Sequence, residues 1–141
     1  MAVVADSGGV YALYDADDLH HRAVTAAVKK ETGPLVLPAP VLGELYYLLR
    51  EFLGVEAELS FLDDVLSGAY TIEPVTAADI RRCRELIATY RNLDLGLADA
   101  SVIAVAERLG VRRVLTVDQR HFRAVRPRGG PFIVLPADRH E

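Results

Sequence analysis

The chain has 141 residues, of which 51% are hydrophobic and 26% charged, and its formal net charge is −4. This composition excludes a disordered protein and indicates one globular domain, residues 1–141, with a substantial core. We expect no membrane span and no secretory signal, and the single cysteine, Cys83, favours a reducing, cytoplasmic setting.

Short β-branched runs alternate with amphipathic patterns along the chain. The predicted strands are Ala2–Ala5, Leu35–Leu37, Tyr70–Glu73, Arg113–Val117 and Phe132–Leu135. The predicted helices are Asp17–Lys30, Pro40–Leu53, Val55–Leu66, residues 76–90 and Leu97–Leu109. Thr76 is expected to cap its helix, with Asp79 completing an imperfect capping box. The alternation predicts an α/β fold with a mostly parallel sheet.

Two carboxylates follow directly on predicted strands. Asp6 ends the run "VVAD", and Asp118 follows "RVLTV". In parallel α/β sheets, functional sites form beyond the carboxyl ends of the strands, so both acids lie at the chemically useful edge. The alternative for each is a helix N-cap. Gly8 and Gly9, in "DSGG", are expected to let the chain leave this edge without crowding a ligand.

Two further carboxylates interrupt apolar helix faces. Glu44 lies three residues after Val41 in "PVLGELYYLL", and Asp99 lies four residues before Ile103 in "LADASVIAVAE". Carboxylates on a buried helical stripe are costly, which favours a functional role. The alternatives are a boundary residue that reaches solvent for Glu44 and a first-turn acid favoured by the helix dipole for Asp99.

Convergence of these four acids would require either protonation or a bound divalent cation. Oxygen ligands suit Mg²⁺ or Mn²⁺, and no Cys/His cluster indicates zinc. Nearby, residues 112–128 hold six arginines and one aspartate, a local net charge of +5. Arginines suit phosphate contacts, although a solvated patch is the alternative. Together these features predict metal-dependent phosphodiester hydrolysis.

The ordered motifs "VVADSGG", "PVLGELYYLL", "LADASVIAVAERLG" and "VLTVDQRHF" resemble the PIN-domain ribonucleases, specifically the toxin component of VapBC-type toxin–antitoxin modules. The resemblance covers nearly the whole chain. It implies a three-layer α/β/α sandwich around a sheet of four or five strands. It also implies an endoribonuclease dependent on Mg²⁺ or Mn²⁺ that cuts RNA, often tRNA or rRNA.

The resemblance maps the catalytic acidic quartet onto Asp6, Glu44, Asp99 and Asp118. In the hypothesis that follows, the three aspartates bind the main ion, and Glu44 binds it directly or through water. Supporting positions map onto Ser7, Thr116 and Asp94. We expect Arg112 and Arg120 above all to hold the RNA backbone. The implied partners are a VapB-like antitoxin and a second copy of the chain.

Three other functions are considered. A phospho-receiver domain needs a lysine at the end of its last strand, but the only lysines are Lys29 and Lys30. A haloacid-dehalogenase-type phosphatase needs an aspartate where Gly8 stands. A non-catalytic PIN-fold binding module stays possible, and metal binding would distinguish it from the enzyme.

Dimerisation has some support from surplus apolar residues in helices 40–53 and 55–66, although packing between these two helices is an alternative use for them. The residues concerned are Tyr46, Tyr47, Leu49, Leu53, Phe61 and Leu62.

Overall fold

A computed structural model describes residues 1–138. Five parallel strands form one sheet in the order β3-β2-β1-β4-β5. Their bounds are β1 Val3–Ala5, β2 Leu35–Pro38, β3 Tyr70–Glu73, β4 Arg113–Leu115 and β5 Ile133–Leu135. The predicted α/β fold and parallel sheet are therefore confirmed. The chain starts in the middle of the sheet, builds one half with β2 and β3, and then crosses to the other side of β1 for β4 and β5.

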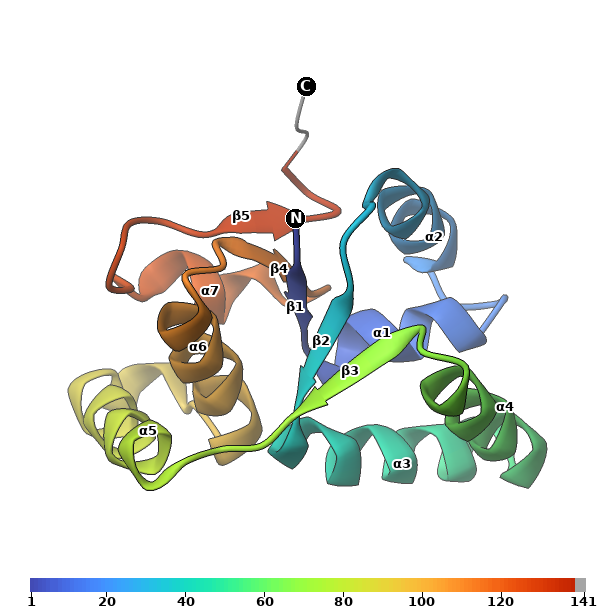
Figure 1. Cartoon of the computed structure of the whole chain (residues 1–141), viewed down its shortest axis with the longest axis horizontal. Coiled ribbons are helices and arrows are strands. Elements are labelled where there is room, and N and C mark those ends of the chain that lie inside the picture. Colours follow the sequence, from blue (N-terminus) through green and yellow to red (C-terminus); the bar gives the residue numbers. More distant parts are fainter. Residues whose placement is uncertain (139–141) are drawn as a thin grey trace.

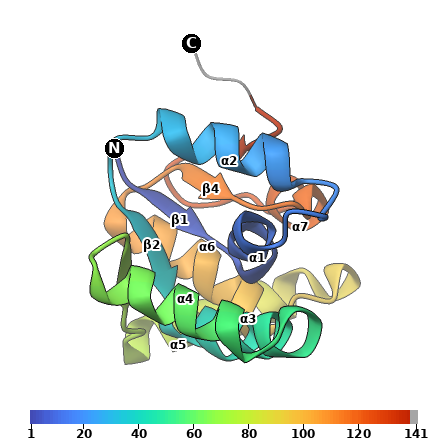
Figure 2. The same ribbon diagram turned by 90° about the vertical axis from the view of Figure 1, so that its right-hand side faces the viewer.

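Helices cover both faces of the sheet (Figure 1). The helices are α1 Ser7–Tyr14, α2 His21–Lys30, α3 Ala39–Leu53, α4 Val55–Leu66, α5 Ala77–Thr89, α6 Leu97–Leu109 and α7 Gln119–Ala124, with a 3₁₀ turn, η1, over Arg91–Leu93. Figure 2 looks onto the side formed by α1 to α4, while α5, α6 and α7 lie behind the sheet. The predicted three-layer arrangement is confirmed. Within residues 1–138, no helix is both long and apolar enough to cross a membrane.

The strand alternation divides the core into two clusters, one on each face. Val4, Val36, Val114 and Val134 pack with α6 on one face. Their neighbours in the same strands pack on the opposite face with residues of α1, α3 and α4: Val3, Ala5, Leu35, Leu37, Leu115 and Leu135. Because both faces are covered by apolar helices, the strands are buried and read as continuous hydrophobic runs.

Three helices differ most from the prediction: α1 and α7 were not among the predicted helices, and α2 begins later than expected. Helix α2 begins at His21 rather than Asp17, because the Asp15 and Asp18 carboxylates accept hydrogen bonds from the backbone N–H groups of Asp17 and His20 and form turns there. Helix α1 was not predicted, since the two glycines after Ser7 have poor helix propensity.

The two glycines belong to α1 and do not have positive φ angles. A Cβ atom on Gly9 would lie 2.7 Å from the backbone oxygen of Leu115, so glycine is needed there for close packing of α1 on β4. The expectation that Gly8 and Gly9 serve only to let the chain leave the strand edge without crowding a ligand is therefore wrong, since Gly9 is needed for packing.

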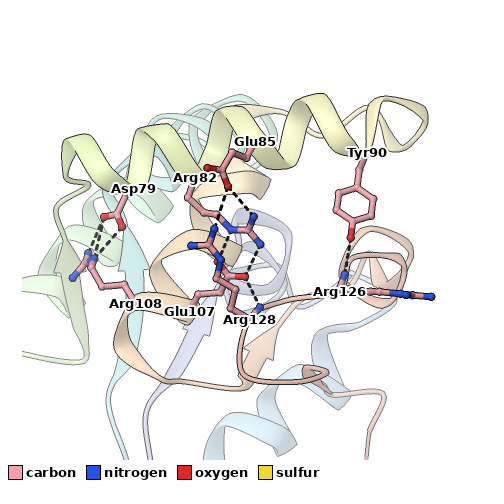
Figure 3. Close-up of polar contacts among 8 residues, drawn as sticks. All are labelled: Asp79, Arg82, Glu85, Tyr90, Glu107, Arg108, Arg126 and Arg128. Carbon is pink, nitrogen blue, oxygen red and sulfur yellow. Dashed lines mark hydrogen bonds and ion pairs between the residues drawn. The ribbon is translucent and has the colours of Figure 1, made fainter.

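Helices α5 and α6 form an antiparallel pair held by ion pairs (Figure 3). Near the start of α5, Asp79 accepts from the Arg108 guanidinium at 3.0 Å, and it forms the predicted capping box with Thr76. Arg82 donates to both oxygens of Glu107 at 2.8 and 2.9 Å. This pairing places the end of α5 beside the start of α6, where Asp99 lies.

The segment after α7 is attached to the same helix pair (Figure 3). The backbone N–H of Arg126 donates to the Tyr90 hydroxyl at 3.0 Å. The backbone N–H of Arg128 donates to Glu107 at 2.7 Å, and its guanidinium donates to Glu85 at 3.2 Å. These contacts fix the path of the chain between α7 and β5.

Candidate active site

The four predicted acids lie around the carboxyl ends of β1 and β4, where the chain crosses from one half of the sheet to the other. Such a crossing opens a crevice at the edge of a parallel sheet. Asp6 is repelled electrostatically by Asp99 and Glu44, and Asp99 is also repelled by Glu44 and Asp118. The structure therefore brings the four carboxylates into one connected electrostatic cluster, which we call the acidic cluster.

Asp6 is the most deeply buried member of the acidic cluster, with 7% of its surface exposed. It caps α1 by accepting a 2.8 Å hydrogen bond from the Gly9 N–H, and it also accepts a hydrogen bond from the Thr116 hydroxyl. Burial raises the pKa of Asp6 to about 7; these two hydrogen bonds lower it, and repulsion from Asp99 and Glu44 adds to the rise. The ionised form of Asp6 is therefore destabilised in the folded protein, and a bound cation would relieve this destabilisation.

Asp99 lies in the first turn of α6 and is half-buried at the crevice. Its carboxylate accepts from the Gly96 N–H at 3.4 Å. Burial raises the pKa of Asp99; repulsion from Glu44 and Asp118 adds to the rise, while His121 and the Gly96 N–H oppose it. Asp99 therefore occupies the first-turn position that the sequence offered as the alternative, and it also interacts with the other acids of the cluster.

Glu44 and Asp118 form the exposed side of the acidic cluster. The Ser7 hydroxyl donates to Glu44 Oε1, so the predicted supporting serine connects α1 to α3. Asp118 caps α7 by accepting from the Arg120 N–H at 3.2 Å. Thr116 contacts both sides of the β1–β4 crevice, since its hydroxyl oxygen also accepts from the Asp118 N–H at 3.0 Å.

Each carboxylate is turned towards a local partner in this structure. Within residues 1–138, no three His, Cys, Asp or Glu side chains form a group that could hold a metal ion as they stand. The donor chemistry nevertheless fits a hard divalent cation, because four carboxylates converge and the innermost is destabilised when ionised.

The remaining predicted residues fall in different places. Arg120 adjoins Asp118 at the acidic cluster. Arg112 precedes β4, at the opposite edge of the sheet, where its guanidinium donates to the Pro131 carbonyl at 3.0 Å. Asp94 ends η1, is exposed and has a φ of 54°. No hydrogen bond or ion pair in residues 1–138 joins it to the acidic cluster.

The arginine-rich segment is less free than its sequence indicates. Arg113 pairs with Glu31 at 2.7 Å, Arg123 with Asp138 at 2.6 Å, and Arg128 with Glu85 at 3.2 Å. Much of the local positive charge is therefore matched by carboxylates. The exposed Arg126 is different, because its backbone is fixed by Tyr90 while its guanidinium has no carboxylate partner within residues 1–138.

His121 is a site residue that sequence reasoning missed. It comes from α7 and is 8% exposed. Its Nδ1 atom lies 3.5 Å from Asp99 Oδ2 and 3.7 Å from Asp118 Oδ2. The available signal was its position three residues after Asp118, which places both side chains on one side of a helical turn.

Comparison with known proteins identifies the family of the chain. Residues 3–126 match the PIN domain family. The chain is 35% identical over 135 residues to Ribonuclease VapC26 of Mycobacterium tuberculosis H37Rv, covering 95% of this chain and all of that protein.

Solved structures share the fold. Mycobacterium tuberculosis VapC20, a toxin that cleaves the sarcin–ricin loop, gives a TM-score of 0.79 at 22% identity, covering 86% of this chain and 94% of the other. A toxin–antitoxin complex from Klebsiella pneumoniae gives 0.71 at 17% identity, with 97% and 99% covered. VapBC2 of Rickettsia felis, bound to a promoter DNA fragment, gives 0.68 at 17% identity, with 95% and 98% covered.

Proposed function

Since the chain belongs to the PIN-domain family, among the VapC-type ribonuclease toxins, we propose that it is a metal-dependent endoribonuclease with the acidic cluster as its active site. The observation that carries this proposal is the convergence of four carboxylates at the β1–β4 crevice, with burial raising the pKa of Asp6 to about 7. A site that destabilises its own charges in this way is suited to a divalent cation.

Asp6, Asp99 and Asp118 would hold Mg²⁺ or Mn²⁺, with Glu44 binding directly or through a water molecule. When bound, such an ion supplies Lewis acidity, which lowers the pKa of an attacking water and stabilises the leaving oxygen. Thr116 fixes the orientation of Asp6, and Ser7 fixes that of Glu44. Both hydroxyls therefore restrict which carboxylate oxygens face the crevice.

We propose Arg120 and Arg126 as contacts to the RNA backbone. Arg120 adjoins the acidic cluster, and Tyr90 holds Arg126 near the end of α5, which lies beside the start of α6. Guanidinium groups at this edge that have no carboxylate partner within residues 1–138 would meet phosphates on either side of the cleaved bond. Arg112 stays a predicted contact, although its position at the opposite edge would require RNA to reach around the sheet.

The substrate that we propose is tRNA or rRNA, cut in the cytoplasm. A VapB-like antitoxin would neutralise the enzyme, and a second copy of the chain would complete a homodimer.

The surface of α3 and α4 supports the proposed homodimer. Leu49 and Phe61 are buried, but Tyr46, Tyr47 and Leu62 are 47% to 58% exposed, so these helices retain apolar surface for a partner. Sedimentation at micromolar concentration would test the dimer, and a purely monomeric species would contradict it.

The decisive test of the activity uses purified protein, radiolabelled RNA, and Mg²⁺, Mn²⁺ or EDTA. We expect cleavage with either ion, none with EDTA, and a large loss with Asp99→Asn. Glu51→Gln is a matched control, because Glu51 is an exposed acid in the same helix as Glu44. Undiminished cleavage by Asp99→Asn, or cleavage that persists in EDTA, would refute the proposal.

A further inference from the structure

The imidazole of His121 is a buried polar group that the proposed reaction does not yet use. It lies in α7 with 8% of its surface exposed, and its Nδ1 atom has no hydrogen-bond partner. Buried ring nitrogens are normally satisfied, so an unpartnered one that faces an acidic cluster needs an explanation.

The surroundings of the ring are different at its two nitrogens. Nδ1 faces carboxylate oxygens of Asp99, at 3.5 Å, and of Asp118, at 3.7 Å. Nε2 lies 3.4 Å from the guanidinium of Arg120. The ring therefore stands between a group that can only donate hydrogen bonds and two groups that, when ionised, can only accept them.

This arrangement determines which nitrogen carries the proton. The Arg120 guanidinium has no acceptor, so a contact with Nε2 is favourable only when Nε2 accepts. The neutral ring then carries its hydrogen on Nδ1, where it points at Asp99 and Asp118. The opposite tautomer would place two donors against each other at Arg120 and would leave a lone pair facing two carboxylates.

We propose that His121 is a positioning residue, which directs its Nδ1–H at Asp99 and Asp118 while Arg120 fixes the tautomer. This inference rests on the proposed function, in which those aspartates bind the metal ion. Asp99 comes from α6 and Asp118 from the end of the β4 segment, so a shared donor would hold together ligands from separate elements. A shift of about 0.5 Å would bring either carboxylate oxygen to an ordinary hydrogen-bond distance.

Such a donor restricts the carboxylates without binding the ion itself. The Oδ2 atom of each aspartate faces His121. This leaves Oδ1 of Asp99 for a cation, whereas Oδ1 of Asp118 also accepts a hydrogen bond from the Arg120 N–H at 3.2 Å. Replacing a group that orients a metal ligand in this way typically lowers the affinity for the metal ion by roughly 10- to 100-fold. The inference also gives Arg120 a role besides RNA contact.

The tautomer can be measured directly by long-range ¹H–¹⁵N correlation NMR of the metal-free protein, at a pH where histidines are neutral. Comparison with His121→Asn assigns the His121 signal. We expect the Nδ1–H tautomer, and we expect Arg120→Ala to shift the ring towards Nε2–H. Arg123→Ala is the control, because Arg123 lies in the same helix but contacts Gln119 and Asp138. A wild-type ring in the Nε2–H form would overturn the proposal.

Calorimetric titration with Mn²⁺ tests the consequence. His121→Phe should weaken binding by about 10- to 100-fold, whereas His121→Asn, which keeps an N–H donor near the Nδ1 position, should restore much of the loss. Equal Mn²⁺ affinity in wild type and His121→Phe would overturn the positioning role. If His121→Phe does not fold, the tautomer of the His121 ring and the affinity for Mn²⁺ are measured in Arg120→Ala instead, and they decide the outcome. A wild type that neither binds Mn²⁺ nor cleaves RNA would instead refute the proposed function, and the tautomer measurement would still test the ring.

Discussion

Replacing Asp6 with asparagine removes the most deeply buried charge of the acidic cluster while preserving its shape. Burial raises the pKa of the Asp6 carboxyl to about 7, against an ordinary value of 3.8. An asparagine can keep both local contacts: its carbonyl accepts from the Gly9 N–H, and its amide donates to the Thr116 hydroxyl. The substitution therefore isolates the effect of the charge.

The raised pKa of Asp6 sets the sign and the size of the effect. Between the ordinary value of 3.8 and about 7, the folded protein keeps a proton that the unfolded chain releases. The contribution of Asp6 to the free energy of unfolding therefore falls as pH rises through this range, and the destabilisation by its charge is complete above it. Ionising Asp6 in the folded protein therefore lowers the free energy of unfolding by about 4 kcal/mol. We expect Asp6→Asn to raise the free energy of unfolding of the metal-free protein by about 2 to 4 kcal/mol near pH 8, and by little near pH 4.

The assay is urea unfolding followed by circular dichroism, in EDTA, across this pH range. Thermal unfolding should show a rise in Tm of roughly 5 to 15 °C for Asp6→Asn near pH 8. Asp118→Asn is the matched control. The Asp118 side chain is 55% exposed, so removal of its charge should change stability much less.

Two results would refute this reasoning about Asp6. One is an Asp6→Asn protein that is no more stable than wild type near pH 8 in EDTA. The other is a stability gain of Asp6→Asn over wild type that does not grow as pH rises from the ordinary value of 3.8 to about 7, since the buried carboxyl would then ionise without cost.

Three further predictions concern the metal, the packing of α1 and the RNA contacts. Mn²⁺ at 100 times its Kd should stabilise wild type by about 2.7 kcal/mol in thermal unfolding; equal stabilisation of Asp6→Asn would place the ion elsewhere. Gly9→Ala should cost about 1 to 3 kcal/mol, because its Cβ would lie 2.7 Å from the Leu115 carbonyl oxygen. Gly8→Ala should cost less in the same urea titration, because its Cβ would meet only side chains, Val117 at 3.2 Å and Asp6 at 3.9 Å. The reverse order would contradict the packing argument. Arg126→Ala should raise the KM for RNA cleavage more than Arg128→Ala, because Arg128 is already paired; equal effects would remove Arg126 from the proposed contacts.

The sequence predicts the sheet and most helices because their local signals agree with the tertiary packing. Helices Val55–Leu66 and Leu97–Leu109 have the bounds that their amphipathic patterns predict, and Gly110 ends the second in the left-handed conformation. Helix α1 was missed because its two glycines oppose helix formation locally. Only the close approach of Gly9 to the Leu115 carbonyl, a contact between distant segments, explains why glycine stands there.

The acidic cluster was predictable for a related reason. Strand ends and interrupted apolar faces are visible in a sequence, and parallel topology brings strand ends to one edge. What a sequence does not show is which charges meet. The arginine segment indicates a basic surface, but Glu31, Glu85 and Asp138 match much of it from distant elements. His121 was missed because a lone histidine carries no signal until Asp99, from α6, lies beside it.

The most direct test of the central claim is to locate Mn²⁺ by anomalous diffraction in crystals of the protein that are saturated with the ion. We predict a peak at ligand distance from Asp6, Asp99 and Asp118, and its loss in crystals of Asp99→Asn. A protein that cleaves RNA in a metal-dependent manner but shows no peak among these acids, or only a peak elsewhere, would contradict the account.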